Sequence, residues 1–177
     1  MMNQNVKLWL RAANPFTPPR GMAEAQRAAR TGAVALVIGA LQGLASIPEL
    51  PGKMAQSMDL VKQGAGASAE EQAIVEAMMG AMLPMMGIGV AVFSVLYMVL
   101  AVVQWRRMTW VIPVIMLVLL AYSLLGALNG LVMFGGKMAG LFTALAVAQW
   151  INMLATAFIY VAAFRGGRML EKLKRDY

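Results

Sequence analysis

The sequence predicts an all-α integral membrane protein, a four-transmembrane-helix bundle with both termini in the cytoplasm. The chain is 60% hydrophobic and only 13% charged over its 177 residues, against about 25% charged residues in soluble domains. Four long runs contain no Asp, Glu, Lys or Arg. Twelve of the fifteen basic residues fall in the segments that flank these runs on one side of the membrane, as the positive-inside rule expects.

Each uncharged run approaches or exceeds the roughly 20 helical residues that cross a hydrocarbon core about 30 Å thick. Lipid offers no hydrogen-bond partners to backbone amides, so each run is expected to be helical. The predicted segments, in chain order, are a cytoplasmic N-terminal tail with interfacial and helical parts (1–30), span one (31–48), an outer segment with amphipathic helices (49–76), an outer helix extension with span two (77–105), a cytoplasmic loop (106–110), span three (111–134), a short outer turn (135–138), span four (139–164) and a basic cytoplasmic tail (165–177).

The direction of insertion follows from the lysines and arginines. Three of them, Lys53, Lys62 and Lys137, are predicted to lie outside. The other twelve are predicted to be cytoplasmic: Lys7, Arg11, Arg20, Arg27, Arg30, Arg106, Arg107, Arg165, Arg168, Lys172, Lys174 and Arg175. The net charge of +7 therefore indicates orientation in a cell membrane, with the lipid bilayer as a partner, and not a nucleic-acid surface.

The chain has neither cysteine nor histidine. Their absence excludes disulfides, thiolate nucleophiles, iron–sulfur clusters, bis-histidine haem and histidine-based acid–base or metal sites. No ionisable side chain lies within a predicted span, which argues against a proton-coupled exporter. The sequence thus predicts no enzymatic activity and no cofactor.

Small residues mark the expected helix contacts. Gly39-Ala-Leu-Gln-Gly-Leu44 in span one and Gly126-Ala-Leu-Asn-Gly-Leu131 in span three share a GxxxG pattern, which permits close approach of helix backbones in lipid. The match has two open explanations, a duplication that gives two parallel-repeat hairpins or chance agreement in a Gly-, Ala- and Leu-rich chain. The predicted packing residues are Gly39, Gly43, Gly126, Gly130, Gly140, Ala144 and Ala148.

Two further groups suggest ligands. The intramembrane amides are Gln42, Asn129, Gln149 and Asn152, which could either join helices by hydrogen bonds or line a path for a neutral solute. Met78, Met82 and Met86 recur at every fourth position. Thioether sulfur is a soft ligand for Cu(I), although methionine also serves as a flexible core filler, and this chain has 17 of them.

These observations rank three classes of function. The first is a non-enzymatic four-helix membrane protein that acts through helix and protein contacts, as a homo-oligomer or as an accessory subunit of a membrane complex. The second is a facilitator or channel for a small neutral solute. The third is a Cu(I)-binding membrane protein.

Overall fold

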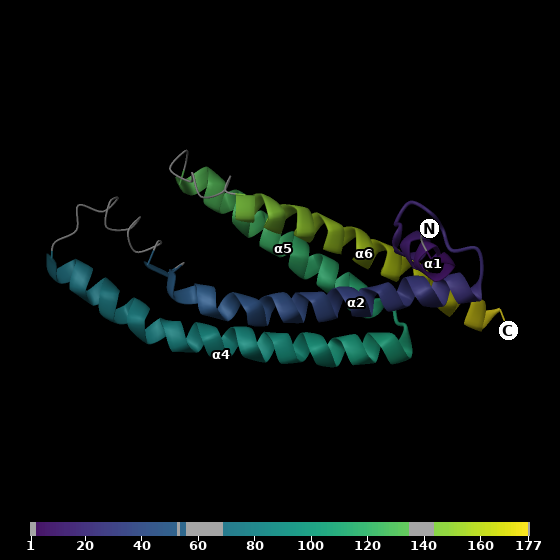
Figure 1. Cartoon of the computed structure of the whole chain (residues 1–177), viewed down its shortest axis with the longest axis horizontal. Coiled ribbons are helices and arrows are strands. Elements are labelled where there is room, and N and C mark those ends of the chain that lie inside the picture. The colour runs from purple at the N-terminus through teal and green to yellow at the C-terminus, as the bar shows by residue number, and fades with distance from the viewer. Residues whose placement is uncertain (1–2, 53, 56–68, 135–143, 177) are drawn as a thin grey trace. The chain divides into compact units, whose positions relative to one another are not determined.

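All regular structure is helical in the residues that the computed structural model describes, 3–52, 54–55, 69–134 and 144–176 (Figure 1). The elements are α1 (Gln4–Ala13), α2 (Met22–Ser46), the short 3-10 helix η1 (Ile47–Glu49), α4 (Ala69–Arg107), α5 (Val111–Phe134) and α6 (Ala144–Arg175). The all-helical part of the predicted fold class is confirmed. Most of the predicted outer segment 49–76 and the predicted turn 135–138 lie outside the described residues.

The chain divides into two compact units. The first unit comprises Met1–Leu36 and Leu100–Tyr177, and the second comprises Val37–Val99. The first part of α2 and the last part of α4 belong to the first unit, and the rest of each helix belongs to the second unit. Within the first unit, α5 and α6 pack against each other and α1 packs against α6 (Figure 1).

Two helical stretches among the described residues are long and apolar enough to cross a membrane. They are Met22–Gly52, with 31 residues, and Glu76–Arg107, with 32 residues. Val111–Gly126 is a shorter apolar helix. These stretches are weak support for a membrane protein, and the number of spans and their direction remain predictions.

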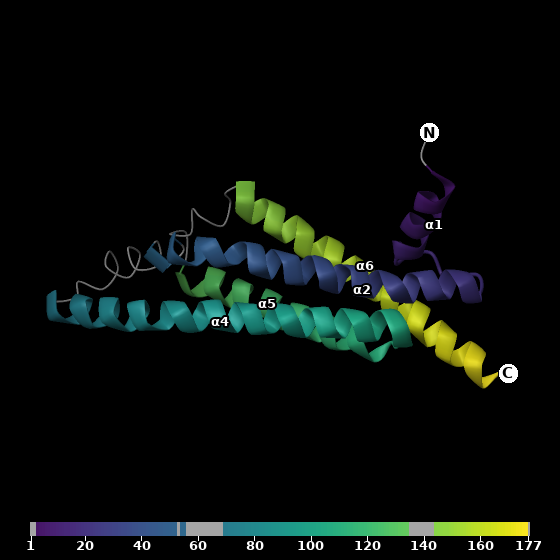
Figure 2. The ribbon, with the colours of Figure 1, turned by 60° about the horizontal axis from the view of Figure 1, so that its bottom comes forward.

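Prolines and asparagine side chains separate α1 from α2. The Asn3 side chain caps α1 by accepting a hydrogen bond from the Asn5 backbone N–H at 3.2 Å. After α1, the Asn14 side chain accepts from the Phe16 N–H at 2.9 Å, an Asx turn that diverts the chain. Figure 2 shows the result: α1 runs across the direction of the first turns of α2.

Helix α2 begins with a side-chain cap supplied by Glu24. The Arg20 backbone N–H donates to Oε2 of Glu24 at 2.7 Å, and the other carboxylate oxygen lies 3.0 Å from Nε of Arg11. A carboxylate in the first turn of a helix also complements the positive end of the helix dipole. One side chain therefore caps α2 and links it to α1.

Helix α4 ends at a residue with an unusual backbone. Met108 has a φ of 50°, the left-handed conformation that usually follows the end of a helix and favours glycine. Its N–H donates to the Gln104 carbonyl at 2.9 Å. Its side chain packs against the buried cluster of Ala25, Ala29 and Leu170. Met108 therefore combines an uncommon backbone conformation with a side chain that packs against this buried cluster.

Helix α6 does not end where span four was predicted to end, at Phe164. It continues through the basic segment to Arg175. The predicted tail at 165–177 is therefore mostly the last part of a long helix. Lysines and arginines in the last turn stabilise that end through the helix dipole.

Candidate functional site

Small residues bring α2 and α6 close together in the first unit. A Cβ atom placed on Gly166 of α6 would lie 2.7 Å from the Ala25 carbonyl oxygen and 2.7 Å from the Ala29 nitrogen, both on α2. One placed on Gly32 would lie 2.9 Å from Cβ of Ala163. We call Ala25, Ala28, Ala29, Gly32, Ala163 and Gly166 the small-residue junction. At this junction the backbone of α2 leaves no room for a side-chain carbon at Gly166.

Helical periodicity explains why these residues meet. Ala25, Ala29 and Gly32 are four and three residues apart, so they form one stripe along α2. Ala163 and Gly166 form the facing stripe on α6. Ala25, Ala29 and Ala163 have no exposed surface. This is the small-xxx-small mode of packing that membrane helices favour.

This junction is not among the predicted packing residues, because those were chosen from small-residue patterns within the predicted spans. Ala25 and Ala29 precede span one, and Gly166 follows the predicted end of span four. The signal that would have found them is the same spacing with alanine admitted, Ala25-xxx-Ala29 followed by Gly32, opposite Ala163-xx-Gly166. A second close contact adjoins it, where a Cβ on Gly167 would lie 2.8 Å from the Trp110 nitrogen.

Gln104 anchors the end of α4 to this junction. Its side chain is fully buried, and its Nε2 donates to the Ala29 carbonyl at 2.9 Å. Its Oε1 is buried without a hydrogen-bond partner among the described residues. The buried amide therefore gains one bond and leaves one acceptor unsatisfied.

This arrangement predicts a graded response at Gln104. Gln104→Leu should lower the free energy of unfolding by only about 1 kcal/mol, because it removes one hydrogen bond and also the unsatisfied acceptor. Gln104→Glu should be more damaging, since it replaces the donor with a buried carboxylate facing a carbonyl oxygen. Thermal unfolding of both variants in mild detergent measures the difference. Equal melting temperatures for the two variants would contradict the assigned hydrogen bond.

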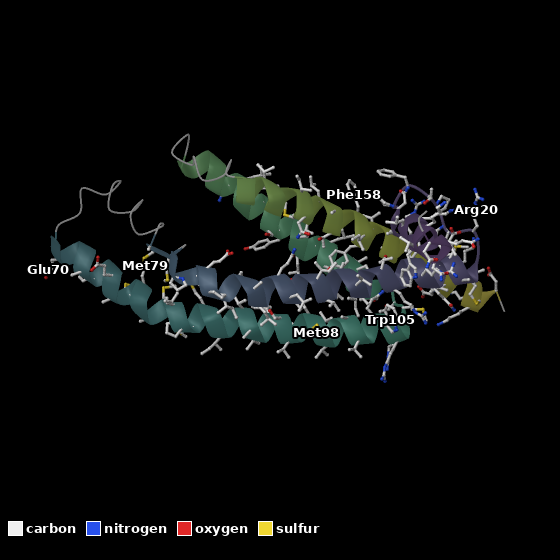
Figure 3. The ribbon with its side chains drawn as sticks, viewed as in Figure 1. Arg20, Glu70, Met79, Met98, Trp105 and Phe158 are labelled. Atoms are coloured by element: carbon white, nitrogen blue, oxygen red, sulfur yellow. The ribbon has the colours of Figure 1, made fainter. Side chains whose placement is uncertain are left out.

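Aromatic rings and arginines surround the junction. The Trp9 and Trp105 rings are stacked with centroids 6.3 Å apart and an interplanar angle of 10°. The Arg30 guanidinium lies 5.2 Å from the Trp105 ring centroid, within cation–π range. Figure 3 shows Trp105 at this end of α4, and nitrogen-bearing side chains gathered around α1 near Arg20. The first unit thus has an aromatic and basic end.

Two polar contacts complete that end. The Arg165 side chain donates to the Pro15 carbonyl, which links α6 to the turn after α1. On the last turns of α6, Arg175 pairs with Glu171 at 2.8 Å. The hydrogen bond from Arg175 lowers the pKa of the Glu171 carboxyl, and one from Trp110 adds to the effect. Glu171 is solvent-accessible, so this pairing contributes little to stability.

The two glycine repeats have different surroundings. In the second unit, a Cβ on Gly39 would lie 3.2 Å from the Tyr97 ring, and one on Gly43 would lie 2.6 Å from Oγ of Ser94. Both partners are on α4. Gly126 on α5 has nothing within 4 Å. No described contact tests the packing role of Gly126, which therefore stays a prediction.

The remaining predicted packing residues, or their surroundings, fall outside the part of the chain that the structure describes. Gly140 is outside the described residues, and the surroundings of Gly130, Ala144 and Ala148 are outside them as well. The same holds for the side chain of Gln149. Their predicted contacts stay predictions.

The polar and methionine candidates lie mostly on the surface. Gln42 and Asn129 are exposed, and Asn152 is half-buried on α6. Met78, Met82 and Met86 of α4 are 61%, 50% and 44% exposed. The described residues contain no group of three or more His, Cys, Asp or Glu side chains suited to a metal. The solute and copper hypotheses stay predictions that no described contact favours.

What the described geometry brings together is a set of helix contacts, at the small-residue junction and at Gly39 and Gly43. Comparison with protein-family models, with curated proteins and with solved structures finds no match for this chain.

Proposed function

We propose that the chain is a non-enzymatic membrane protein with four spans and cytoplasmic termini, which assembles with further copies of itself in the cell membrane. Helices α2, α4, α5 and α6 would contain the spans. Each includes a long uncharged run, and the basic residues flank these runs with the bias that sets orientation.

The observation that carries the proposal is the exposed apolar surface of α4. Ile88, Val92, Phe93 and Val95 are each between 61% and 65% exposed. They lie in a run from Ala77 to Trp105 that contains no charged residue. A soluble protein rarely exposes a continuous apolar surface of this kind, whereas lipid tails accommodate it at no energetic cost.

The orientation is testable with reporter fusions. A reporter that is active only in the cytoplasm should give signal when fused after Tyr177, because the C-terminal segment carries five of the basic residues. The same reporter inserted near Ala67 should give none. A periplasm-active reporter at both sites serves as the reciprocal control. Cytoplasmic activity near Ala67 would contradict the proposed direction.

Self-assembly is supported by one face of α5. Tyr122, Gly126 and Asn129 lie four and three residues apart on this helix, and all three are exposed. Tyr122 is 77% exposed. A hydroxyl and an amide that face lipid need hydrogen-bond partners, which a second helix at this face would supply. The open space at Gly126 would admit its close approach.

The assembly is testable by native mass spectrometry of the full chain from mild detergent. We expect a mass that corresponds to two or more copies of the 19.0 kDa chain. A complex that includes other proteins would instead favour the accessory-subunit alternative. A monomer without a partner would contradict the proposal.

A further inference from the structure

Helix α1 presents three distinct faces. Ala12 is 5% exposed, and Trp9 on the same side stacks on Trp105, so this face contacts the protein. Val6 and Leu10, one turn apart, are 45% and 57% exposed and form an apolar face. The third face holds Gln4, Lys7 and Arg11. The apolar face lies between the other two, and the polar face is opposite the protein face.

The contacts of α1 place it at the level where the predicted spans end. Trp9 stacks on Trp105, which directly precedes the basic pair that ends α4. Phe16, just after α1, has its ring centroid 6.0 Å from that of Phe158, two turns before Arg165 on α6. Tryptophan is typical of the headgroup layer at the end of a span.

The direction of α1 fits the same level. Figure 2 shows that α1 runs across the first turns of α2, and Figure 1 views α1 nearly along its axis while α2 runs crosswise. A helix perpendicular to the spans lies parallel to the bilayer surface. An amphipathic helix in that position buries its apolar face at the boundary of headgroups and acyl chains.

The charge around α1 favours an anionic surface. The described residues of the first unit contain twelve lysines and arginines but only three acidic residues, Glu24, Glu171 and Asp176. Two of these three already pair with arginines. Lys7, Arg20, Arg106 and Arg107 are exposed. A surface with this excess of positive charge matches the anionic lipids of a cytoplasmic leaflet.

From these observations we infer that α1 is an interfacial helix, which seats its Val6–Leu10 face on an anionic lipid leaflet with Lys7 among the phosphates. The inference rests on the proposed membrane topology. It adds a lipid-binding element that works outside the spans and responds to headgroup charge.

Site-directed spin labelling tests the inference on the full chain. Because the protein has no cysteine, single variants Leu10→Cys, Gln4→Cys and Val118→Cys each accept one nitroxide. The labelled proteins are reconstituted into nanodiscs of phosphatidylcholine alone or mixed with phosphatidylglycerol. Collision of each label with oxygen, which concentrates in lipid, and with a water-soluble nickel complex reports its surroundings. Val118 is 62% exposed on α5 and serves as the control for a span.

In the discs that contain phosphatidylglycerol, we expect the oxygen-to-nickel ratio at Leu10 to exceed that at Gln4 several-fold. In phosphatidylcholine alone, the ratio at Leu10 should fall several-fold. Equal ratios at Leu10 and Gln4 in the anionic discs would overturn the inference, and so would low collision with both reagents, which indicates a protein contact. An unchanged ratio at Leu10 between the two lipids would overturn the preference for anionic headgroups.

The Val118 label separates this inference from the proposed function. A high oxygen-to-nickel ratio at Val118 together with a low one at Leu10 would overturn only the lipid-binding role of α1. High collision with nickel together with low collision with oxygen at Val118 would show that α5 lies in water, which overturns the proposed topology and the inference that rests on it.

Discussion

Replacing Gly166 by alanine is expected to lower the free energy of unfolding by about 3 kcal/mol, the upper part of the usual range for overpacking a filled core. The added Cβ would lie 2.7 Å from two backbone atoms of α2 and 2.8 Å from Cβ of Ala28. Backbone atoms cannot rotate aside, so α2 and α6 would have to separate. Thermal or denaturant unfolding in mild detergent measures the loss.

Gly89→Ala is the matched control. Gly89 lies inside α4 with nothing within 4 Å of its added Cβ. Alanine there should be neutral or should stabilise the helix by up to about 1 kcal/mol, because alanine is the better helix former. If Gly166→Ala is as stable as Gly89→Ala, the close approach of α2 and α6 at the small-residue junction is wrong.

Gly43→Leu and Gly126→Leu are expected to have different effects, although both glycines belong to GxxxG motifs. Gly43→Leu should destabilise the fold of the single chain, because its Cβ alone would lie 2.6 Å from Oγ of Ser94, and that hydroxyl is held by its bond to the Val90 carbonyl. Gly126→Leu meets no described neighbour. It should keep the melting temperature of the chain but dissociate the assembly, since it fills the space that the proposed second helix needs.

Two measurements on each variant separate the effects, thermal unfolding in detergent and oligomer mass by native mass spectrometry. Val92→Leu, a similar substitution at an exposed position of α4 outside the proposed contact, should change neither. A Gly126→Leu protein that stays assembled would place the contact between copies elsewhere. A Gly43→Leu protein as stable as the parent would contradict the contact between α2 and α4 in the second unit.

Much of the helical framework is predictable from the amino-acid sequence. Pro15, Pro18 and Pro19 predict the break before α2, since proline cannot continue a helix from the preceding turn. The helix predicted over 77–105 is present within the 39 residues of α4, which contains Pro84. Local propensity and uncharged runs suffice for these features because each depends on neighbours in sequence.

The candidate site was less predictable. Gly39 and Gly43 were chosen for their spacing, and both lie against α4. Gly126 has the same spacing and an open environment. A GxxxG motif indicates that a helix can pack closely against a second helix, but it does not identify the second helix.

What the sequence determined by itself is therefore the helical class, the positions of the breaks and the clustering of basic charge, all of which follow from composition and local periodicity. Only the tertiary structure decided which helices contact each other. Gly166 meets Ala25 across 141 positions of sequence, which the spacing of neither residue reveals. The side chain of Met108 packs against Ala25, Ala29 and Leu170. These contacts join residues that are far apart in the sequence, so local periodicity does not reveal them.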